Sequence, residues 1–88
     1  MLRLNPKDNV AVALRRLQRG DRAEVEDGYV DVAEPIPFGH KIALGRISKG
    51  DGVIKYGEII GTATSQVDPG QHVHVHNLQS ARLPGQPT

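Results

Sequence analysis

The chain has 88 residues, enough for one domain with a modest core. Its 11 basic and 10 acidic residues leave a net charge of +1, which argues against a nucleic-acid-binding protein. The sequence contains no cysteine, so disulfides, thiolate catalysis and cysteine-ligated metals are excluded. Residues 1–7 lack a signal-peptide core, and no apolar run approaches the ~20 residues that span a membrane. We therefore expect a cytoplasmic protein that does not enter a membrane.

The predicted elements, in chain order, are short strands. The β-branched, alternating run Val10–Leu14 predicts a strand followed by one helical turn. Further strands are expected at residues 30–32, 41–44, 53–56, 58–60 and 72–76. Pro35 and Pro37 lie on either side of Ile36 and predict an extended edge or connector. The fold class is all-β with short helical turns, in one compact domain of residues 1–80 and a flexible tail of residues 81–88.

Part of the chain repeats itself. Three segments share an Ala, a branched aliphatic residue four positions on, a Gly seven positions on and then a polar residue: Ala13–Asp21, Ala43–Asp51 and Ala63–Gln71. We expect the aliphatic residue of each segment to fill the core, and the Gly to reverse the chain at positive φ. An apolar residue of the next extended stretch follows each Gly, at Val25, Val53 and Val73. The repeat predicts one pseudo-symmetric β domain.

Three of the four histidines lie within His72–His76. On a strand, His72, His74 and His76 would share one face about 7 Å apart, with Val73 and Val75 directed into the core. They could approach one ion or line a polar cleft, although a solvent-facing strand would tolerate the same residues. Because metal sites need three or four convergent ligands, the loop residue His40 or another chain would have to complete such a site.

A second candidate feature is the segment Lys55-Tyr56-Gly57-Glu58. Lysine and tyrosine can donate hydrogen bonds to carboxylates or hydroxyls, and Gly57 would let the backbone turn beside them. A strand end with a core tyrosine and a solvated lysine is the alternative. The sequence has no serine nucleophile elbow, Gly-rich phosphate loop or dinucleotide motif. The residues alone therefore indicate a small β domain with a histidine-lined face.

Five segments together resemble the altronate and galactarate dehydratase family, in order and in spacing. They are Asn9–Leu14, Gly39–Leu44, Val53–Glu58, Ile60-Gly61 and His72–Asn77, and the resemblance covers roughly residues 5–77. In that family the region is the N-terminal SAF domain, an antifreeze-like β-clip, and in some members it is a separate small subunit. The chain is also similar to the small subunit of sulfolactate sulfo-lyase.

The resemblance implies part of a lyase that removes water from a sugar acid, usually with a divalent metal such as iron or manganese. The catalytic region of such enzymes is much longer, so the isolated chain is expected to be inactive without a larger catalytic chain or domain. The resemblance implies catalytic roles for His40, His74 and His76, and substrate contacts for Lys41, Lys55, Tyr56 and Asn77. Metal contacts are predicted for His72, His74 and His76 from their shared strand face.

Other functions remain open at this point. The sulfo-lyase small subunit would share the same α-hydroxy-acid chemistry, and a sulfite-release assay would distinguish it. A non-catalytic carbohydrate-binding or assembly module is the alternative from another class, and a stand-alone metal-binding protein is a further one. We expect a natural small subunit rather than an excised domain, and homo-oligomerisation is left open.

Overall fold

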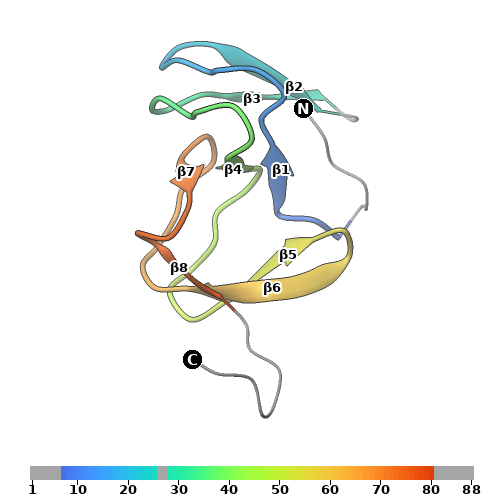
Figure 1. Cartoon of the computed structure of the whole chain (residues 1–88), viewed down its shortest axis with the longest axis vertical. Coiled ribbons are helices and arrows are strands. Elements are labelled where there is room, and N and C mark those ends of the chain that lie inside the picture. Colours follow the sequence, from blue (N-terminus) through green and yellow to red (C-terminus); the bar gives the residue numbers. More distant parts are fainter. Residues whose placement is uncertain (1–6, 26–27, 81–88) are drawn as a thin grey trace.

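The computed structural model describes residues 7–25 and 28–80, and these contain eight short strands and no helix (Figure 1). The strands are β1 (Val10–Val12), β2 (Arg22–Val25), β3 (Gly28–Asp31), β4 (Lys41–Ala43), β5 (Gly52–Lys55), β6 (Glu58–Ala63), β7 (His72–Val73) and β8 (Leu78–Ser80). The all-β prediction is confirmed. The expected tail at residues 81–88 lies outside the described residues. Within the described part of the chain, no helix could cross a membrane.

The helical turn expected after β1 is a bend in the structure. The backbone N–H groups of Ala13 and Leu17 donate to the carbonyl oxygens of His40 and Ile36, at 2.8 and 2.9 Å, rather than to the preceding turn of their own segment. The helical turn therefore does not form, because these N–H groups bind a segment that is distant in the sequence.

The strands form three small antiparallel sheets. Sheet β1-β4-β7 lies in the middle of the molecule, with hairpin β2-β3 at one end and sheet β5-β6-β8 at the other (Figure 1). Strand β6 continues beyond the expected Ile60 because Gly61–Ala63 pair with β8. The central sheet carries the candidate site, since β4 and β7 are neighbours in it.

The structure contains a fourth copy of the repeat, which the sequence pattern missed. Val32, Ile36, Gly39 and His40 occupy the places of the Ala, the aliphatic residue, the Gly and the polar residue. Ile36 is 0% exposed, although its flanking prolines led us to expect only an extended edge or connector. The glycines of all four copies have positive φ, with values of 91°, 82°, 89° and 85° along the chain, as predicted for three of them.

The four copies associate as two antiparallel pairs. Leu17 pairs with Ile36 and Ile47 pairs with Val67, and each pair exchanges both backbone hydrogen bonds. The first pair belongs to one buried cluster: Ala11, Ala13, Leu17, Ala23, Val30, Val32, Ile36 and Ile42. The second belongs to another: Val10, Ala43, Ile47, Val53, Ala63, Val67 and Val73. After the first copy, Val25 lies in the extended strand β2 as predicted, and the residue of that strand in the buried cluster is Ala23.

Replacing Gly70 by Ala should destabilise the domain far more than replacing Gly50 by Ala. Both glycines have nearly the same φ, 85° and 89°, but a Cβ at Gly70 would overlap the carbonyl oxygen of Asp31 whereas Gly50 faces open space. We expect Gly50→Ala to cost about 1–2 kcal/mol from the backbone conformation alone. Gly70→Ala should cost at least about 3 kcal/mol, measured by urea denaturation. Equal losses would contradict the close packing at Gly70.

Candidate functional site

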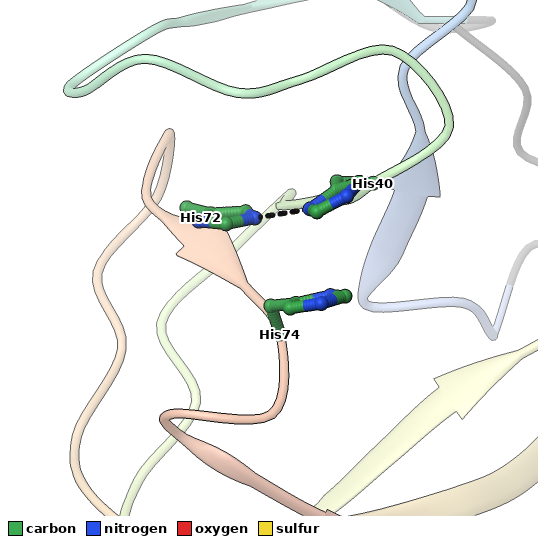
Figure 2. Close-up of side chains that lie close together, drawn as sticks. All are labelled: His40, His72 and His74. Carbon is green, nitrogen blue, oxygen red and sulfur yellow. Dashed lines mark hydrogen bonds between the residues drawn. The ribbon is translucent and has the colours of Figure 1, made fainter.

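Three histidines from different parts of the chain meet beside the central sheet. One ring nitrogen from each of His40, His72 and His74 lies within 4.8 Å of the other two. His40 Nδ1 is 2.8 Å from His72 Nε2, and the His40 and His74 rings stack with centroids 4.1 Å apart. Figure 2 shows the three rings nearly parallel, in the space between β7 and the segment that leads into β4. All three residues are half-buried.

The pairing of β4 with β7 explains why these histidines meet. Lys41 lies opposite Val73 and Ile42 lies opposite His72 in an antiparallel register. Continuing this register by one residue places His40 opposite His74, on the neighbouring position of the same ladder. The sheet thus brings together residues that are more than 30 positions apart in the sequence.

The three imidazoles fit a metal ion in spacing and in donor type. Metal–nitrogen bonds of about 2.1 Å place neighbouring ligand atoms about 3.0 Å apart in an octahedral site and about 3.4 Å apart in a tetrahedral one. In the cluster, His40 Nδ1 and His72 Nε2 are 2.8 Å apart, near these values, while the largest separation allowed within the group, 4.8 Å, is wider. Three ligands on one side would leave further coordination positions open to a substrate.

The predicted strand at residues 72–76 is wrong in its length. Strand β7 ends at Val73 and the chain turns over residues 74–77. Val75, expected in the core, is 79% exposed. The ring of His76 is exposed and lies 5.2 Å from that of His72 in a tilted arrangement, outside the group that could hold one ion. The structure brings His40 to His72 and His74, and a ligand role for His76 stays a prediction.

Asn77 is the residue that turns the chain away from β7. Its buried side chain accepts a hydrogen bond from the His74 backbone N–H at 2.9 Å and donates one to the His72 carbonyl at 2.8 Å. Its own N–H donates to the His74 carbonyl. Both ends of the amide therefore hold the backbone that carries two histidines. Its predicted contact with a substrate is not tested by this arrangement.

The environment favours the neutral imidazole at two residues of the cluster, His72 and His74. The pKa of His72 is lowered by burial and then by the neighbouring histidines, while Glu34 acts in the opposite direction. Glu34 Oε2 also accepts the His72 backbone N–H at 3.0 Å, a contact that the sequence did not predict. The pKa of His74 is lowered by burial and then by His40 and Lys41. Because neutral imidazole is the form that binds metals, these shifts suit a ligand cluster.

The stability of the metal-free chain should fall as the pH decreases below about 6.5. His72 and His74 have lower pKa values in the folded chain than their ordinary value of 6.5, so the unfolded chain takes up protons first. Their contribution is fully present above pH 6.5 and is lost as the pH falls through the folded-state values. Urea midpoints between pH 7.5 and 5 would measure this. His72→Gln should flatten the profile in this range, and an unchanged profile would contradict the assignment.

One of the predicted substrate lysines lies near the histidines, and the second lies close enough to affect the first. Lys41 follows His40 at the start of β4, and its pKa is lowered by burial and then by Lys55. The same Lys41 charge acts on His74. Lys55 Nζ lies 4.8 Å from the centre of the Tyr56 ring. Of the predicted substrate residues, Lys41 therefore lies near the cluster, and Lys55 lies near Lys41 and over the Tyr56 ring.

Tyr56 occupies an unusual backbone conformation. Tyr56 and Gly57 connect β5 to β6 with φ values of 56° and 77°, in a two-residue turn closed by the pair Lys55 and Glu58. The Gly57 N–H donates to the buried Asp8 at 2.7 Å, a support that sequence reasoning missed. Such turns favour Asn before Gly. Tyr56 is 47% exposed, so it is not the core residue of the alternative interpretation.

Replacing Tyr56 by Asn should stabilise the domain. Asn tolerates positive φ, so the substitution should relieve a backbone cost of about 1 kcal/mol and raise the free energy of unfolding by roughly 0.5–1 kcal/mol. Thermal and urea denaturation would measure the change. Tyr56→Phe is the control, because it keeps the ring at the same φ and should leave the stability within about 0.5 kcal/mol. A loss of stability in Tyr56→Asn would contradict this interpretation of the turn.

Fold and site together define a small all-β domain with a half-buried cluster of three histidines that could hold a metal ion. Residues 1–81 match the altronate/galactarate dehydratase SAF domain, and the chain belongs to this family.

Three relatives illustrate the range of this family. The chain is 39% identical over 79 residues to altronate dehydratase of Bacillus subtilis (strain 168) and 42% identical over 79 residues to altronate dehydratase of Escherichia coli (strain K12). In both cases the match covers 90% of this chain but only 16% of the relative. It is also 49% identical over 47 residues to (2R)-sulfolactate sulfo-lyase subunit alpha of Paracoccus pantotrophus, covering 53% of this chain and 70% of that subunit.

Proposed function

We propose that this chain contributes the cluster of His40, His72 and His74 to the active site of a hydro-lyase that acts on a sugar acid. A larger catalytic chain or domain completes that site. The observation that carries the proposal is the three-histidine cluster itself, in a chain of the dehydratase SAF family. The need for a partner is supported by length, because the chain spans about a sixth (16%) of the dehydratases that it matches.

The charges beside the cluster suit an acidic substrate. Lys41 and Lys55 would bind the substrate carboxylate through charge-assisted hydrogen bonds, which are stronger than neutral ones. The Tyr56 hydroxyl would donate to a substrate hydroxyl. Because the Lys41 charge already affects His74, a carboxylate bound there would lie close to the histidines. Asn77 would act on the substrate through the histidine backbone that it holds.

A divalent metal would be held by His40, His72 and His74. Imidazole ligands suit iron better than manganese, which prefers carboxylates and water, so we propose iron. When bound, the metal supplies positive charge that stabilises the negative charge developing on the substrate as a C–H proton next to the carboxylate is removed.

His76, exposed beside His72, is the proposed proton acceptor of this reaction. Histidine is the side chain most often used as a general base, and an exposed imidazole can reach a substrate held by a partner chain. Proton-transfer roles for His40 and His74 would apply only in a state in which they do not hold the metal.

Reconstitution tests the proposal. The chain would be used to capture its partner from native extract, and the purified components would be assayed separately and together for dehydration of altronate and galactarate. Activity that appears only in the mixture, and is lost with His76→Ala, supports the proposal. Dehydration by the partner alone, at the rate of the mixture, would refute it. A chain that binds a sugar acid unaided and captures no enzyme would instead be a binding module.

The sulfo-lyase small subunit is a second candidate, and it is favoured by one observation. The chain covers 70% of the length of the sulfolactate sulfo-lyase subunit alpha, which is itself a separate small chain. Both substrates are α-hydroxy acids, so the same lysines and histidines would serve. Sulfite release from (2R)-sulfolactate by the reconstituted mixture, without dehydration of sugar acids, would select this function.

A further inference from the structure

We propose that Pro37 positions His40 for the site, because proline removes a backbone N–H group that would otherwise bind the His40 side chain. The inference deepens the proposed function, on which its metal-binding consequence rests. It comes from comparing the four copies of the repeat, three of which close their turns in a way that the fourth does not.

In three copies the ninth side chain caps the turn. It accepts a hydrogen bond from the backbone N–H of the sixth residue, as is typical of Asp, Asn and Ser side chains in turns. The donors are the N–H groups of Gln18, Ser48 and Asp68, and the acceptors are Asp21 Oδ2, Asp51 Oδ2 and Gln71 Oε1, at 2.9, 3.3 and 2.8 Å.

The backbone of the remaining copy has the same turn. The His40 N–H donates to the Pro37 carbonyl at 3.1 Å, as the ninth residue does to the sixth in the other copies, at 3.0, 2.9 and 3.1 Å. Gly39 has the same positive φ as the other three glycines. The sixth and ninth residues therefore stand in the same relation in all four copies. Only the capping bond cannot form, because proline has no N–H.

A capping bond in this copy would occupy His40 Nδ1, the ring nitrogen that faces His72 in the cluster. In histidine, Nδ1 is bonded to Cγ, as Oδ is in aspartate, so Nδ1 of His40 is the atom that would reach an N–H at position 37. In the structure this nitrogen lies 2.8 Å from His72 Nε2 instead. A ring nitrogen that accepts a hydrogen bond from the backbone cannot use the same lone pair for His72 or a metal. Pro37 therefore converts a turn-closing position into a ligand position.

Restoring the N–H tests this. We expect Pro37→Ser, which introduces the residue found at this position in the copy Ala43–Asp51, to lower the affinity of the isolated chain for Zn²⁺ about tenfold. Ser48→Pro is the matched control. It removes the N–H that Asp51 caps, at a position where the fourth copy shows that proline fits, and should leave the affinity unchanged. Pro37→Ala offers the same N–H and is the second variant should the first fail to fold. Unchanged affinity in a folded Pro37 variant would overturn the proposal.

A second measurement needs no metal. In nitrogen-15 NMR spectra of the metal-free Pro37→Ser chain, the new amide at position 37 should be protected from hydrogen exchange and the ring nitrogens of His40 should shift. An amide that exchanges as fast as an exposed loop, with unchanged His40 signals, would overturn the inference even where the chain binds metal. Protection and a shift in a chain that binds no metal would support the role of Pro37 and count against the metal site.

Discussion

His72→Ala should lower the affinity of the chain for Zn²⁺ by at least about a hundredfold. His72 lies 2.8 Å from His40 at their nearest ring nitrogens, and its ring stacks with that of His74, so its removal takes one of three convergent ligands. Structural zinc sites with four ligands bind with about 10–16 kcal/mol, so one ligand is worth several kcal/mol, and each 1.4 kcal/mol is about tenfold. Calorimetric titration against a competing chelator would measure the loss.

His76→Ala is the matched control for this prediction. The exposed His76 ring lies outside the group of three, so the affinity should change less than about threefold. With the catalytic partner present, the dehydration rate of the same variant should fall about 10²–10⁴-fold if His76 accepts the substrate proton. An equal loss of Zn²⁺ affinity in both variants would mean that His76 is a ligand, as its spacing in the sequence predicts.

Asn77→Ala should both destabilise the domain and weaken metal binding. The buried Asn77 amide holds the backbone of His72 and His74, and its removal leaves a partly buried N–H and a partly buried carbonyl without these partners. We expect a loss of about 2–3 kcal/mol in the free energy of unfolding. Zn²⁺ affinity should fall about 10–100-fold, as for other groups that orient metal ligands. Urea denaturation and chelator competition would measure the two effects.

Asn77→Asp separates the two hydrogen bonds of this amide. Aspartate keeps an acceptor for the His74 N–H but has no donor for the His72 carbonyl, so its effects should lie between those of wild type and Asn77→Ala. Destabilisation without any change in affinity, in both variants, would show that the turn supports the fold and not the cluster.

The repeat illustrates how far the sequence could be interpreted. The burial of a branched aliphatic residue such as Leu17 and the positive φ of a turn glycine such as Gly20 could be predicted, because both follow from the residue type. The fourth copy escaped notice since Pro35 and Pro37 have strong local preferences of their own, which favour an extended connector. Ile36, which stands between the two prolines, is buried because it pairs with Leu17, a contact between distant parts of the chain.

The candidate site was only partly predictable. Alternation at His72–His76 identified the correct segment, and the strand prediction failed where the side chain of Asn77 replaced ladder partners and turned the chain. Alternating polarity describes a strand only as long as a neighbouring strand pairs with it. Val75 and His76 lie beyond the residues that pair with β4, so the alternation of valine and histidine at these positions does not produce a strand.

By itself, the sequence determined the all-β class, the turn glycines and the family, because these depend on residue types at fixed local spacings. Which histidines meet was decided only by the tertiary structure. The antiparallel register of β4 with β7 places His40 beside His74, and no spacing along the chain encodes that register. Pro37 shows the same division: its missing N–H is a property of one residue, but its effect on His40 depends on a turn that three other copies close differently.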